Sequence, residues 1–187
     1  VPDKTQEKYW QTCTCLGSWH YEQGIYNQNR YKSAQQVISM LIDVVSKNGN
    51  LLLSVPVRAD GTIDDKEIAI LADIKEWMDI NGQTIYSTRP WKTFGEGPLA
   101  EASNPLNAQG FNENNNYSDA DIRVVQRNDT VFAFTMRYPE EKSCTIKSLG
   151  TTSEHCNGKV KSVTMPGYGP VEFTQSAEGL DIRVHET

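Results

Sequence analysis

The sequence predicts an α/β domain followed by an antiparallel β-sandwich, and three observations support this fold class. Within the first 92 residues, two segments with hydrophobic residues at helical spacing alternate with two short strand-like runs. From about residue 119 the hydrophobic residues recur with a period of two, in several short runs. Residues 93–118 are rich in Gly, Pro, Asn and Ser, which is typical of a connection. We therefore expect an α/β domain over 1–92, a linker over 93–118 and a β-sandwich over 119–187.

The first strand and the first long helix are predicted from local signals. Residues 9–15 are β-prone, and Ser33 begins a helix because Gln36 stands where it completes a capping box. Residues 47–49, Lys-Asn-Gly, end this helix with a cation near its last carbonyls and a residue suited to the left-handed conformation. The buried stripe of the helix follows the spacing i, i+3, i+4, i+7 and consists of Val37, Met40, Leu41 and Val44.

A second strand and helix complete a β-α-β-α order. The run "NLLLSVPV" (50–57) is apolar almost throughout, as expected of a parallel strand covered on both faces. Asp64 and Glu67 form a second capping pair, before a helix that ends at Asn81-Gly82. The inward stripe of this helix consists of Ile70, Leu71, Ile74, Trp77 and Met78. Because two parallel strands do not form a stable sheet alone, other strands must complete it.

Short β runs follow one another through the second half of the chain. Hydrophobic residues on both sides of 127–130 predict a hairpin there. The further runs lie near 143–149, 159–165, 170–174 and 180–185. Cys144 and Cys156 either close a small loop as a disulfide in an oxidising compartment or remain two thiols, and the sequence leaves both possibilities open.

Charge and motif content exclude several classes of partner and chemistry. The formal net charge of −6 would repel nucleic acid and anionic membranes, so a neutral substrate fits better. No apolar run approaches the roughly 18 residues that crossing a bilayer requires. The chain has no Gly-rich nucleotide-binding loop, no His-Glu-x-x-His and only 3 histidines. We therefore expect no metal and no other cofactor.

Two segments that follow the predicted strands are candidates for a functional site, because loops at the carboxyl ends of parallel strands converge. Residues 16–32 exceed the roughly 2–6 residues usual for such a loop, and residues 58–61 form the second segment. The first segment carries Trp19, His20 and Tyr21, and an aromatic ring beside polar groups suits the apolar C–H face of a sugar. The alternative is structural, with Trp19 packed on the rim of the domain and His20 an exposed loop residue.

Cleavage of a glycosidic bond needs two carboxyl groups, one of them protonated as the general acid. The carboxylates in the predicted loops are Glu7, Glu22 and Asp60. Asp60 precedes Gly61 in "RADGTID", which is typical of a turn, so its presence has a structural explanation. Glu7 and Glu22 have no partner at a diagnostic spacing, and a lone loop glutamate is usually a solvated surface group.

Three stretches of the chain resemble the end of the catalytic domain of α-L-fucosidases of glycoside hydrolase family 29. They are "YWQTCTCLGSWHY" (9–21), "YKSAQQVISMLIDVVSKNGNLLLSVPVRADGTI" (31–63) and "WMDINGQTIYSTRPW" (77–91), in the family's order and spacing. The stretch "DIRVVQRNDTVFAFTMRYP" (121–139) is similar to the opening of the family's C-terminal β domain. The version "SVPVRADG" is similar to that of bacterial, gut-type members.

The resemblance implies a retaining mechanism on a (β/α)8-like barrel. A complete barrel takes roughly 250 residues, so the α/β part corresponds to its last two β/α units, with Trp10 to Cys15 as the penultimate strand. The family's aspartate nucleophile belongs to an earlier strand, which is expected upstream of Val1. Trp19, within "SWHY", corresponds to the aromatic residue that lines the fucose pocket, and we expect His20 and Tyr21 to bind substrate beside it.

The general acid/base is the point at which this chain departs from part of the family. Some members carry a glutamate within the Trp-x-Thr-Cys motif, whereas this chain has Gln11 there. Because an amide cannot deliver a proton, the acid/base is expected upstream of Val1, on the loop that precedes the first strand. Glu7 and, after it, Glu22 are the alternatives within the chain.

The expected function is therefore a share of a retaining exo-α-L-fucosidase, with this chain alone inactive. Its expected partners are a fucosylated glycan and the N-terminal part of the same catalytic domain, in a periplasmic or extracellular location and with a bacterial source. One alternative is a non-catalytic carbohydrate-binding protein that uses Trp19 and the sandwich. Another is a retaining glycosidase with a different sugar specificity.

Overall fold

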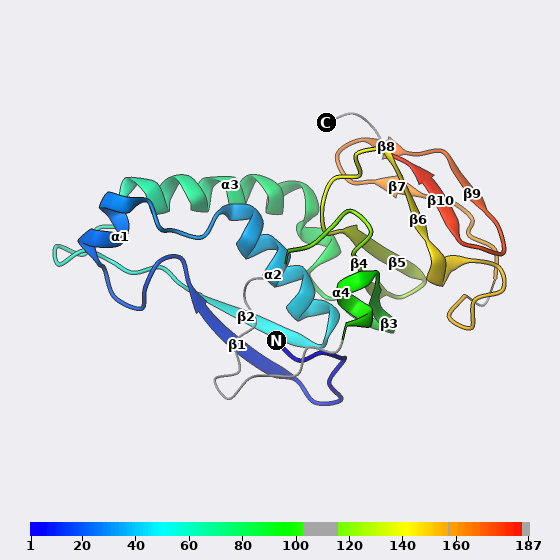
Figure 1. The fold of residues 1–187 in the computed structure, drawn as a ribbon, viewed down its shortest axis with the longest axis horizontal. Coiled ribbons are helices and arrows are strands. Elements are labelled where there is room, and N and C mark those ends of the chain that lie inside the picture. Colours follow the sequence, from blue (N-terminus) through cyan, green and yellow to red (C-terminus); the bar gives the residue numbers. More distant parts are fainter. Residues whose placement is uncertain (103–115, 157, 185–187) are drawn as a thin grey trace.

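Helices and a parallel strand pair form one end of the molecule, and antiparallel sheets form the other (Figure 1). The computed structural model describes residues 1–102, 116–156 and 158–184. Residues 103–115 of the predicted linker therefore lie outside the described residues. The antiparallel sheets agree with the predicted sandwich, and the parallel pair agrees with the predicted β-α-β order.

The first β-α-β unit forms where the sequence predicts it. Strand β1 (Trp10–Cys15) pairs in parallel with β2 (Gly49–Ser54), and helix α2 (Ala34–Ser46) connects them. The predicted capping box is present: Ser33 Oγ accepts from Gln36 N at 3.2 Å, and Gln36 Oε1 accepts from Ser33 N at 2.8 Å. These two bonds satisfy backbone donors that the first turn of a helix leaves open.

A short helix that the sequence patterns do not predict lies in the long segment after β1. Helix α1 (Gln23–Gln28) begins after Glu22, which makes no side-chain capping bond, and ends at Asn29 in the left-handed conformation. Without a capping side chain, and with only Ile25 buried, α1 carries neither of the signals by which a helix is recognised in a sequence.

The third helix is capped differently from the prediction. Helix α3 (Asp65–Asn81), followed by the 3-10 turn η1 (Gly82–Thr84), begins where Asp64 Oδ1 accepts from Glu67 N at 2.9 Å. The Glu67 carboxylate makes no return bond to the backbone, so Asp64 caps the helix alone. The predicted inward stripe of α3 is only half-buried in this chain and consists of Ile70, Leu71, Ile74, Trp77 and Met78.

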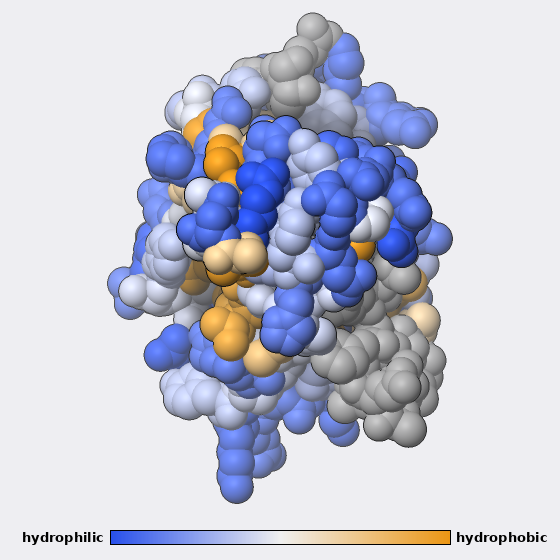
Figure 2. Space-filling model, turned by 90° about the vertical axis from the view of Figure 1, so that its left-hand side faces the viewer, coloured by the Kyte–Doolittle hydropathy of each residue, from blue (hydrophilic) through white to orange (hydrophobic). Residues whose placement is uncertain are grey.

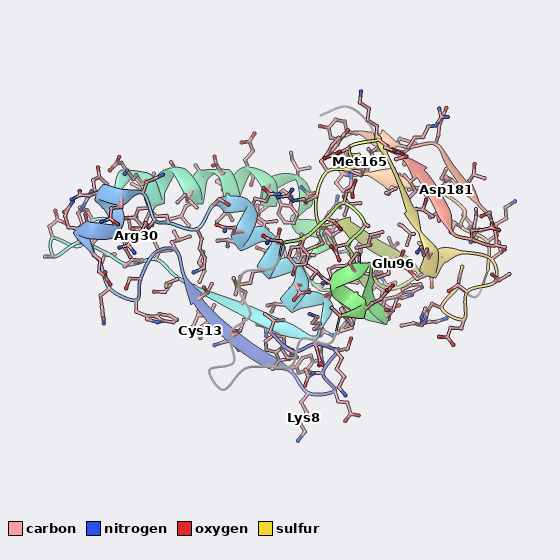
Figure 3. The ribbon with its side chains drawn as sticks, viewed as in Figure 1. Lys8, Cys13, Arg30, Glu96, Met165 and Asp181 are labelled. Atoms are coloured by element: carbon pink, nitrogen blue, oxygen red, sulfur yellow. The ribbon has the colours of Figure 1, made fainter. Side chains whose placement is uncertain are left out.

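One face of the β1–β2 pair is uncovered, whereas β2 was expected to be covered on both faces. Helix α2 packs on one side, and the Leu52 side chain on the other side is 53% exposed. Cys13, the register partner of Leu52, projects from β1 away from α2 (Figure 3). The described residues therefore place no layer over this face of β2, although the strand is apolar almost throughout.

In the part of the chain that the structure describes, the sandwich consists of two three-stranded sheets and a small hairpin. Strand β4 (Ile122–Arg127) lies between β3 (Arg89–Glu96) and β5 (Thr130–Thr135), with the predicted turn at 127–130 joining β4 to β5. In the second sheet, β10 (Leu180–Arg183) lies between β6 (Ser143–Ile146) and β9 (Phe173–Gln175). The hairpin pairs β7 (Thr164–Met165) with β8 (Gly169–Pro170).

Strand β3 begins before the predicted linker and extends into it. It pairs antiparallel with β4, with an irregularity between Pro90 and Gly95. A Cβ at Gly95 would lie 2.3 Å from the Ile122 carbonyl oxygen, so only glycine allows the two backbones to approach this closely. The short helix α4 (Pro98–Glu101) follows. Glycine and proline residues whose sequence pattern is typical of a connection therefore lie in an edge strand and in the short helix that follows it.

A side chain of β3 also links the two larger sheets. Glu96, labelled in Figure 3, accepts backbone N–H bonds from Lys147 at 2.7 Å and Ser148 at 2.8 Å. These residues belong to the 3-10 turn η2 (Lys147–Leu149), which occupies the end of the predicted run 143–149. The core between the sheets is formed by Ile122, Val124, Ile146 and Leu180.

Helix α2 joins the two ends of the molecule because it is covered on two sides. One side faces β2, and the other packs on β3 and β4 (Figure 1). Ile42 of α2 is 5% exposed and shares a core cluster with Ile85 and Met136. This second contact explains why burial on α2 extends beyond the predicted stripe to Ile42 and Asp43.

Cys144 and Cys156 are not bonded to one another, so the structure agrees with the thiol alternative. The Cys156 thiol donates to the Gly158 carbonyl at 3.1 Å and accepts from Gln175 Nε2 at 3.4 Å. Cys144 lies in β6, where burial, with smaller contributions from Asp181 and Glu96, raises the pKa of its thiol. The two sulfurs therefore lie in different surroundings within the sandwich and do not bond to each other.

Candidate active site

The loops after β1 and β2 meet at the carboxyl ends of the two strands, as predicted. Leu16 N donates to Ser54 O at 3.1 Å, which extends the pairing to the point where the loops begin. From the second loop, the Arg58 guanidinium lies 5.6 Å from the ring centroid of Tyr21 and 5.7 Å from that of Tyr26. Figure 2 shows that this end of the molecule is largely hydrophilic, with hydrophobic residues gathered in a narrow band.

Residues 16–32, which we call the aromatic loop, are fixed at both of their ends. Lys32 N donates to Leu16 O at 2.8 Å, so the last residue of the loop bonds to the first. A Cβ at Gly17 would lie 3.0 Å from two atoms of the Tyr31 ring, so this ring lies directly against the start of the loop. The backbone hydrogen bond between its two ends therefore closes the aromatic loop.

Tyr31 also connects the aromatic loop to the start of α3. Its hydroxyl donates to Asp64 Oδ2 at 2.6 Å. Burial and the neighbouring Asp64 carboxylate raise the pKa of Tyr31 far above its ordinary value, which keeps the hydroxyl proton in place as a donor. Lys66 Nζ donates to Tyr26 O at 2.6 Å and gives the loop a second attachment to α3.

A buried carboxyl pair lies beneath this attachment. Asp64 and Glu67 are both 0% exposed, and neither Glu67 oxygen has a hydrogen-bond partner among the described residues. Burial, and next the charge of Asp64, raise the pKa of Glu67 to about 7. Sequence patterns identified these two residues as a helix cap, and nothing in the sequence indicated that the glutamate would be enclosed.

The three residues predicted to bind substrate are adjacent, and they differ in their surroundings. Trp19 is 52% exposed, and His20 is also exposed. Tyr21 is half-buried beside Arg58, and its hydroxyl donates to Gln23 Oε1 at 3.3 Å. The arrangement leaves a tryptophan ring available to a ligand while Tyr21 holds the loop to its neighbour. The role of Arg58 was not predicted, because a single arginine before a turn carries no signal of a stacking partner.

Glu22 and Glu7 lie at opposite ends of β1. Glu22, before α1 in the aromatic loop, accepts from Ser18 Oγ at 2.6 Å and is exposed. Glu7 lies near the amino end of β1, where the neighbouring Gln6 N donates to Lys47 O at 3.2 Å. At roughly 3.3 Å per residue, the six residues of β1 separate Glu7 from the aromatic loop by about 20 Å.

Asp60 takes the structural role that its sequence context predicts. Its Oδ1 accepts from Thr62 N at 3.0 Å and from Thr62 Oγ1 at 2.7 Å, while Gly61 adopts a φ of 83°. These hydrogen bonds from Thr62 lower the pKa of Asp60, so its carboxyl group is ionised and unsuited to donating a proton.

Gln11 lies on β1 with an exposed side chain, and its Nε2 is 4.0 Å from Cys13 Sγ. Both residues stand on the uncovered face of the strand pair, because side chains two apart on a strand share a face.

Within residues 1–102, 116–156 and 158–184, no group of three or more His, Cys, Asp or Glu side chains is placed to hold a metal ion. The helices of the same residues lack the length and apolar character needed to cross a membrane.

Two family models match the chain and together cover most of it. The model described as alpha-L-fucosidase matches residues 1–83, and the model described as alpha-L-fucosidase C-terminal domain matches residues 114–187. The first match contains both loops of the candidate site, and the second contains the sandwich strands from β4 to β10, whereas β3 lies between the two matches. The chain therefore belongs to the α-L-fucosidase family, which confirms the resemblance of its motifs.

Individual relatives agree with the two models. The chain is 36% identical to the alpha-L-fucosidase of Dictyostelium discoideum over 93 residues, which are 49% of this chain and 20% of that protein. It is 26% identical to the tissue alpha-L-fucosidase of Mus musculus over 177 residues, which are 93% of this chain and 33% of the relative. The chain thus spans about a third or less of the length of these two curated relatives.

The fold is also that of a solved fucosidase. The structure of Thermotoga maritima alpha-fucosidase in complex with fucose matches 98% of this chain and 37% of its own, with a TM-score of 0.71 and 23% identity. At this level of identity the match describes the fold alone.

Proposed function

We propose that this chain is part of a retaining exo-α-L-fucosidase that removes terminal α-L-fucose from glycans. The observation that carries the proposal is the exposed Trp19 on a loop held at the carboxyl ends of β1 and β2, in a chain of the α-L-fucosidase family. A tryptophan ring offers a flat apolar surface to the C–H face of a sugar. The solved relative from Thermotoga maritima is described as binding fucose, which supports the choice of sugar.

In this proposal, Trp19 stacks on fucose, and His20 and Tyr21 supply polar contacts to its hydroxyl groups. Histidine and tyrosine can both donate and accept hydrogen bonds, as recognition of a polyol requires. The contact between Tyr21 and Arg58 supports this arrangement, because it links the loop after β1 to the loop after β2. The neutral ligand is also compatible with the net charge of −6.

The strand pair and its helices are proposed to be the last two units of a (β/α)8-like barrel, with the N-terminal part of the same catalytic domain as partner. The uncovered Leu52 and the half-buried stripe of α3 support this, because further strands and helices would cover both. The resulting division is a barrel part over 1–92 and a sandwich part over 119–187, and the placement of β3 indicates that the sandwich part begins near Arg89.

Retaining hydrolysis uses a carboxylate nucleophile and a second carboxyl group that acts first as acid and then as base. We propose that both groups are contributed from upstream of Val1. Gln11 cannot donate the proton. The distance of about 20 Å between Glu7 and the aromatic loop argues against Glu7 as the acid/base. Glu22 is the alternative acid within the chain, and its exposed carboxylate accepts from Ser18 Oγ at 2.6 Å.

The test compares the full-length protein with residues 1–187 alone, using an aryl α-L-fucoside as substrate. We expect the full-length protein to release fucose with the anomeric configuration retained, as followed by NMR, and residues 1–187 alone to be inactive. Hydrolysis by residues 1–187 alone would show that the catalytic carboxylates lie within this chain. A full-length protein that cleaves a different glycoside, or only binds sugar, would support one of the two alternatives given above.

A periplasmic or extracellular location and a bacterial source stay predictions of the family resemblance. The thiols of Cys144 and Cys156 lend no support to an oxidising compartment, since they are unpaired. Fractionation of the source cells, followed by detection of the protein in the periplasm or the medium, tests the location.

A further inference from the structure

We propose that Tyr31, Asp64 and Glu67 form a positioning chain that holds the aromatic loop in its substrate-binding conformation only while the two carboxyl groups share one proton. The inference rests on the proposed function, since it concerns the loop that carries Trp19. None of the three residues is proposed to touch substrate. They act through Gly17 and the loop backbone.

The path from the carboxyl pair to Trp19 consists of direct contacts. Asp64 Oδ2 accepts from the Tyr31 hydroxyl at 2.6 Å. The Tyr31 ring then lies against Gly17, where a Cβ would approach it to 3.0 Å. Gly17 stands two residues before Trp19 in the chain. A displacement of Asp64 therefore moves the tyrosine ring, and the ring supports the backbone from which Trp19 projects.

The carboxyl pair provides the two states. Asp64 already accepts from Tyr31 and from Glu67 N, and Glu67 has no hydrogen-bond donor of its own among the described residues. With a proton on Glu67, its carboxyl group can donate to Asp64, and the pair carries a single negative charge. Without that proton, two carboxylates face each other in a site that water does not reach, and like charges in such a site repel strongly.

The surrounding charges decide where the proton resides. Burial alone would raise the pKa of Asp64, but hydrogen bonds from Tyr31 and from the Glu67 N–H lower it below its ordinary value. Burial and the Asp64 charge raise the pKa of Glu67 to about 7. Arg58, from the loop after β2, lowers the pKa of Glu67 by a smaller effect. Its guanidinium also stands beside Tyr21 and 3.7 Å from the Asp65 carboxylate. Glu67 therefore holds the shared proton and releases it near neutral pH.

The experiment measures kcat and KM of the full-length protein for an aryl α-L-fucoside from about pH 5 to about pH 9. We expect the KM of the wild-type protein to rise roughly two- to tenfold as the pH passes through about 7, because the loop loses its anchored position. Changes in kcat report the groups that perform the chemistry, so the effect on KM separates positioning from catalysis.

Two variants test the chain of contacts. Glu67→Gln keeps the size of the side chain and can donate to Asp64 without titrating, so its KM should stay at the low, acid-side value over the whole range. Tyr31→Phe removes the bond to Asp64 and keeps the ring, so its KM should be raised roughly two- to tenfold at every pH and lose its dependence on pH near neutrality. Glu76→Gln, an exposed position on the same helix, is the matched control and should reproduce the wild-type profile.

The positioning chain is wrong if Glu67→Gln shows the same rise in KM as the wild-type protein. If Glu67→Gln fails to fold, Tyr31→Phe decides, since a KM profile like that of the wild-type protein would equally overturn the inference. A wild-type protein without activity on any α-L-fucoside would contradict the proposed function instead. In that event, tryptophan fluorescence of wild type and Glu67→Gln through the same pH range tests the loop movement, and coincident curves overturn it.

Discussion

Arg123 of β4 donates from Nε to Asp43 Oδ1 of α2 at 2.6 Å, and both side chains are almost completely buried. Lys47 Nζ lies 2.9 Å from the other oxygen of Asp43. The Phe94 ring stands 4.9 Å from the Lys47 ammonium and 5.4 Å from the Arg123 guanidinium. The Asp43 carboxylate thus pairs with two buried cations where the α/β part meets the sandwich. We expect the contact between these two parts to depend on its charge.

Asp43→Asn should destabilise the protein strongly, because it leaves two buried cations without a counter-charge. Removing one partner of a buried ion pair typically costs about 3–5 kcal/mol. The midpoint of urea unfolding of the full-length protein measures the loss. Asp79→Asn is the control, since the pair of Lys75 and Asp79 is exposed and of the type worth at most about 0.5 kcal/mol. Equal shifts in the two variants would mean that the buried cluster contributes no more than a surface pair.

Gly95→Ala should disrupt the pairing of β3 with β4. Its Cβ would lie 2.3 Å from the Ile122 carbonyl oxygen and 3.0 Å from Arg123 Cδ, and neither can withdraw without moving the sheet or the buried ion cluster. We expect a loss of about 2 kcal/mol or more, measured as a lowered thermal midpoint. The matched control is Gly24→Ala in α1, where a Cβ meets nothing within 4 Å and stability should be unchanged or slightly increased. A Gly95→Ala protein as stable as wild type would contradict the close approach.

The elements predicted from the sequence are those whose signals are local. The capping box of Ser33 and Gln36 lies within one turn of chain, and it places the start of α2 at the correct residue. Strand β3 was missed for the opposite reason. Its sequence contains the glycines of a connection, and it is a strand because β4, far along the chain, pairs with it and leaves no space for a side chain at Gly95. Pairing between distant segments cannot be predicted from the sequence of either segment alone.

The same distinction applies to the candidate site. The position of Trp19 after β1 follows from the strand order, so the loop was predicted together with its place at the carboxyl ends. The burial of Glu67 could not be predicted. A glutamate in the first turn of a helix usually faces water, where its negative charge interacts favourably with the helix dipole. The hydrogen bond of Tyr31 to the neighbouring Asp64 is equally hidden from the sequence, because it joins residues separated by another helix and a strand.

Glu67 should make the protein less stable as the pH rises. The folded state holds its proton with a pKa of about 7, against an ordinary value of 4.5, so this contribution to stability is complete below about pH 4.5 and is lost as the pH rises through about 7. At about 1.4 kcal/mol for each pKa unit, the loss is at most about 3.5 kcal/mol. Thermal midpoints at about pH 5 and about pH 8 should therefore differ less in Glu67→Gln than in the wild-type protein. The same difference in both proteins would show that other groups set the dependence.

Cys144 and Cys156 should behave as thiols in the native protein. A reducing agent should leave the thermal midpoint unchanged, because no disulfide joins them. Burial raises the pKa of the Cys144 thiol, so little of its thiolate is present near neutral pH and alkylation should be slow until the protein is unfolded. Mass spectrometry after alkylation with and without denaturant measures both effects. A mass consistent with a Cys144–Cys156 bond in the untreated protein would contradict the arrangement of the sandwich.

Trp19→Ala should weaken transition-state binding in the full-length protein by about 1–3 kcal/mol in kcat/KM, because one stacking surface for the sugar is lost. The side chain is 52% exposed and its removal leaves no buried cavity, so the thermal midpoint should change little. Trp19→Phe keeps an aromatic surface and should recover part of the loss. Tyr86→Ala serves as control, since this tyrosine is 66% exposed and lies beyond α3, at the other end of that helix from the aromatic loop. An unchanged kcat/KM for Trp19→Ala would assign Trp19 to the rim of the domain as a structural residue, which is the alternative that the sequence leaves open.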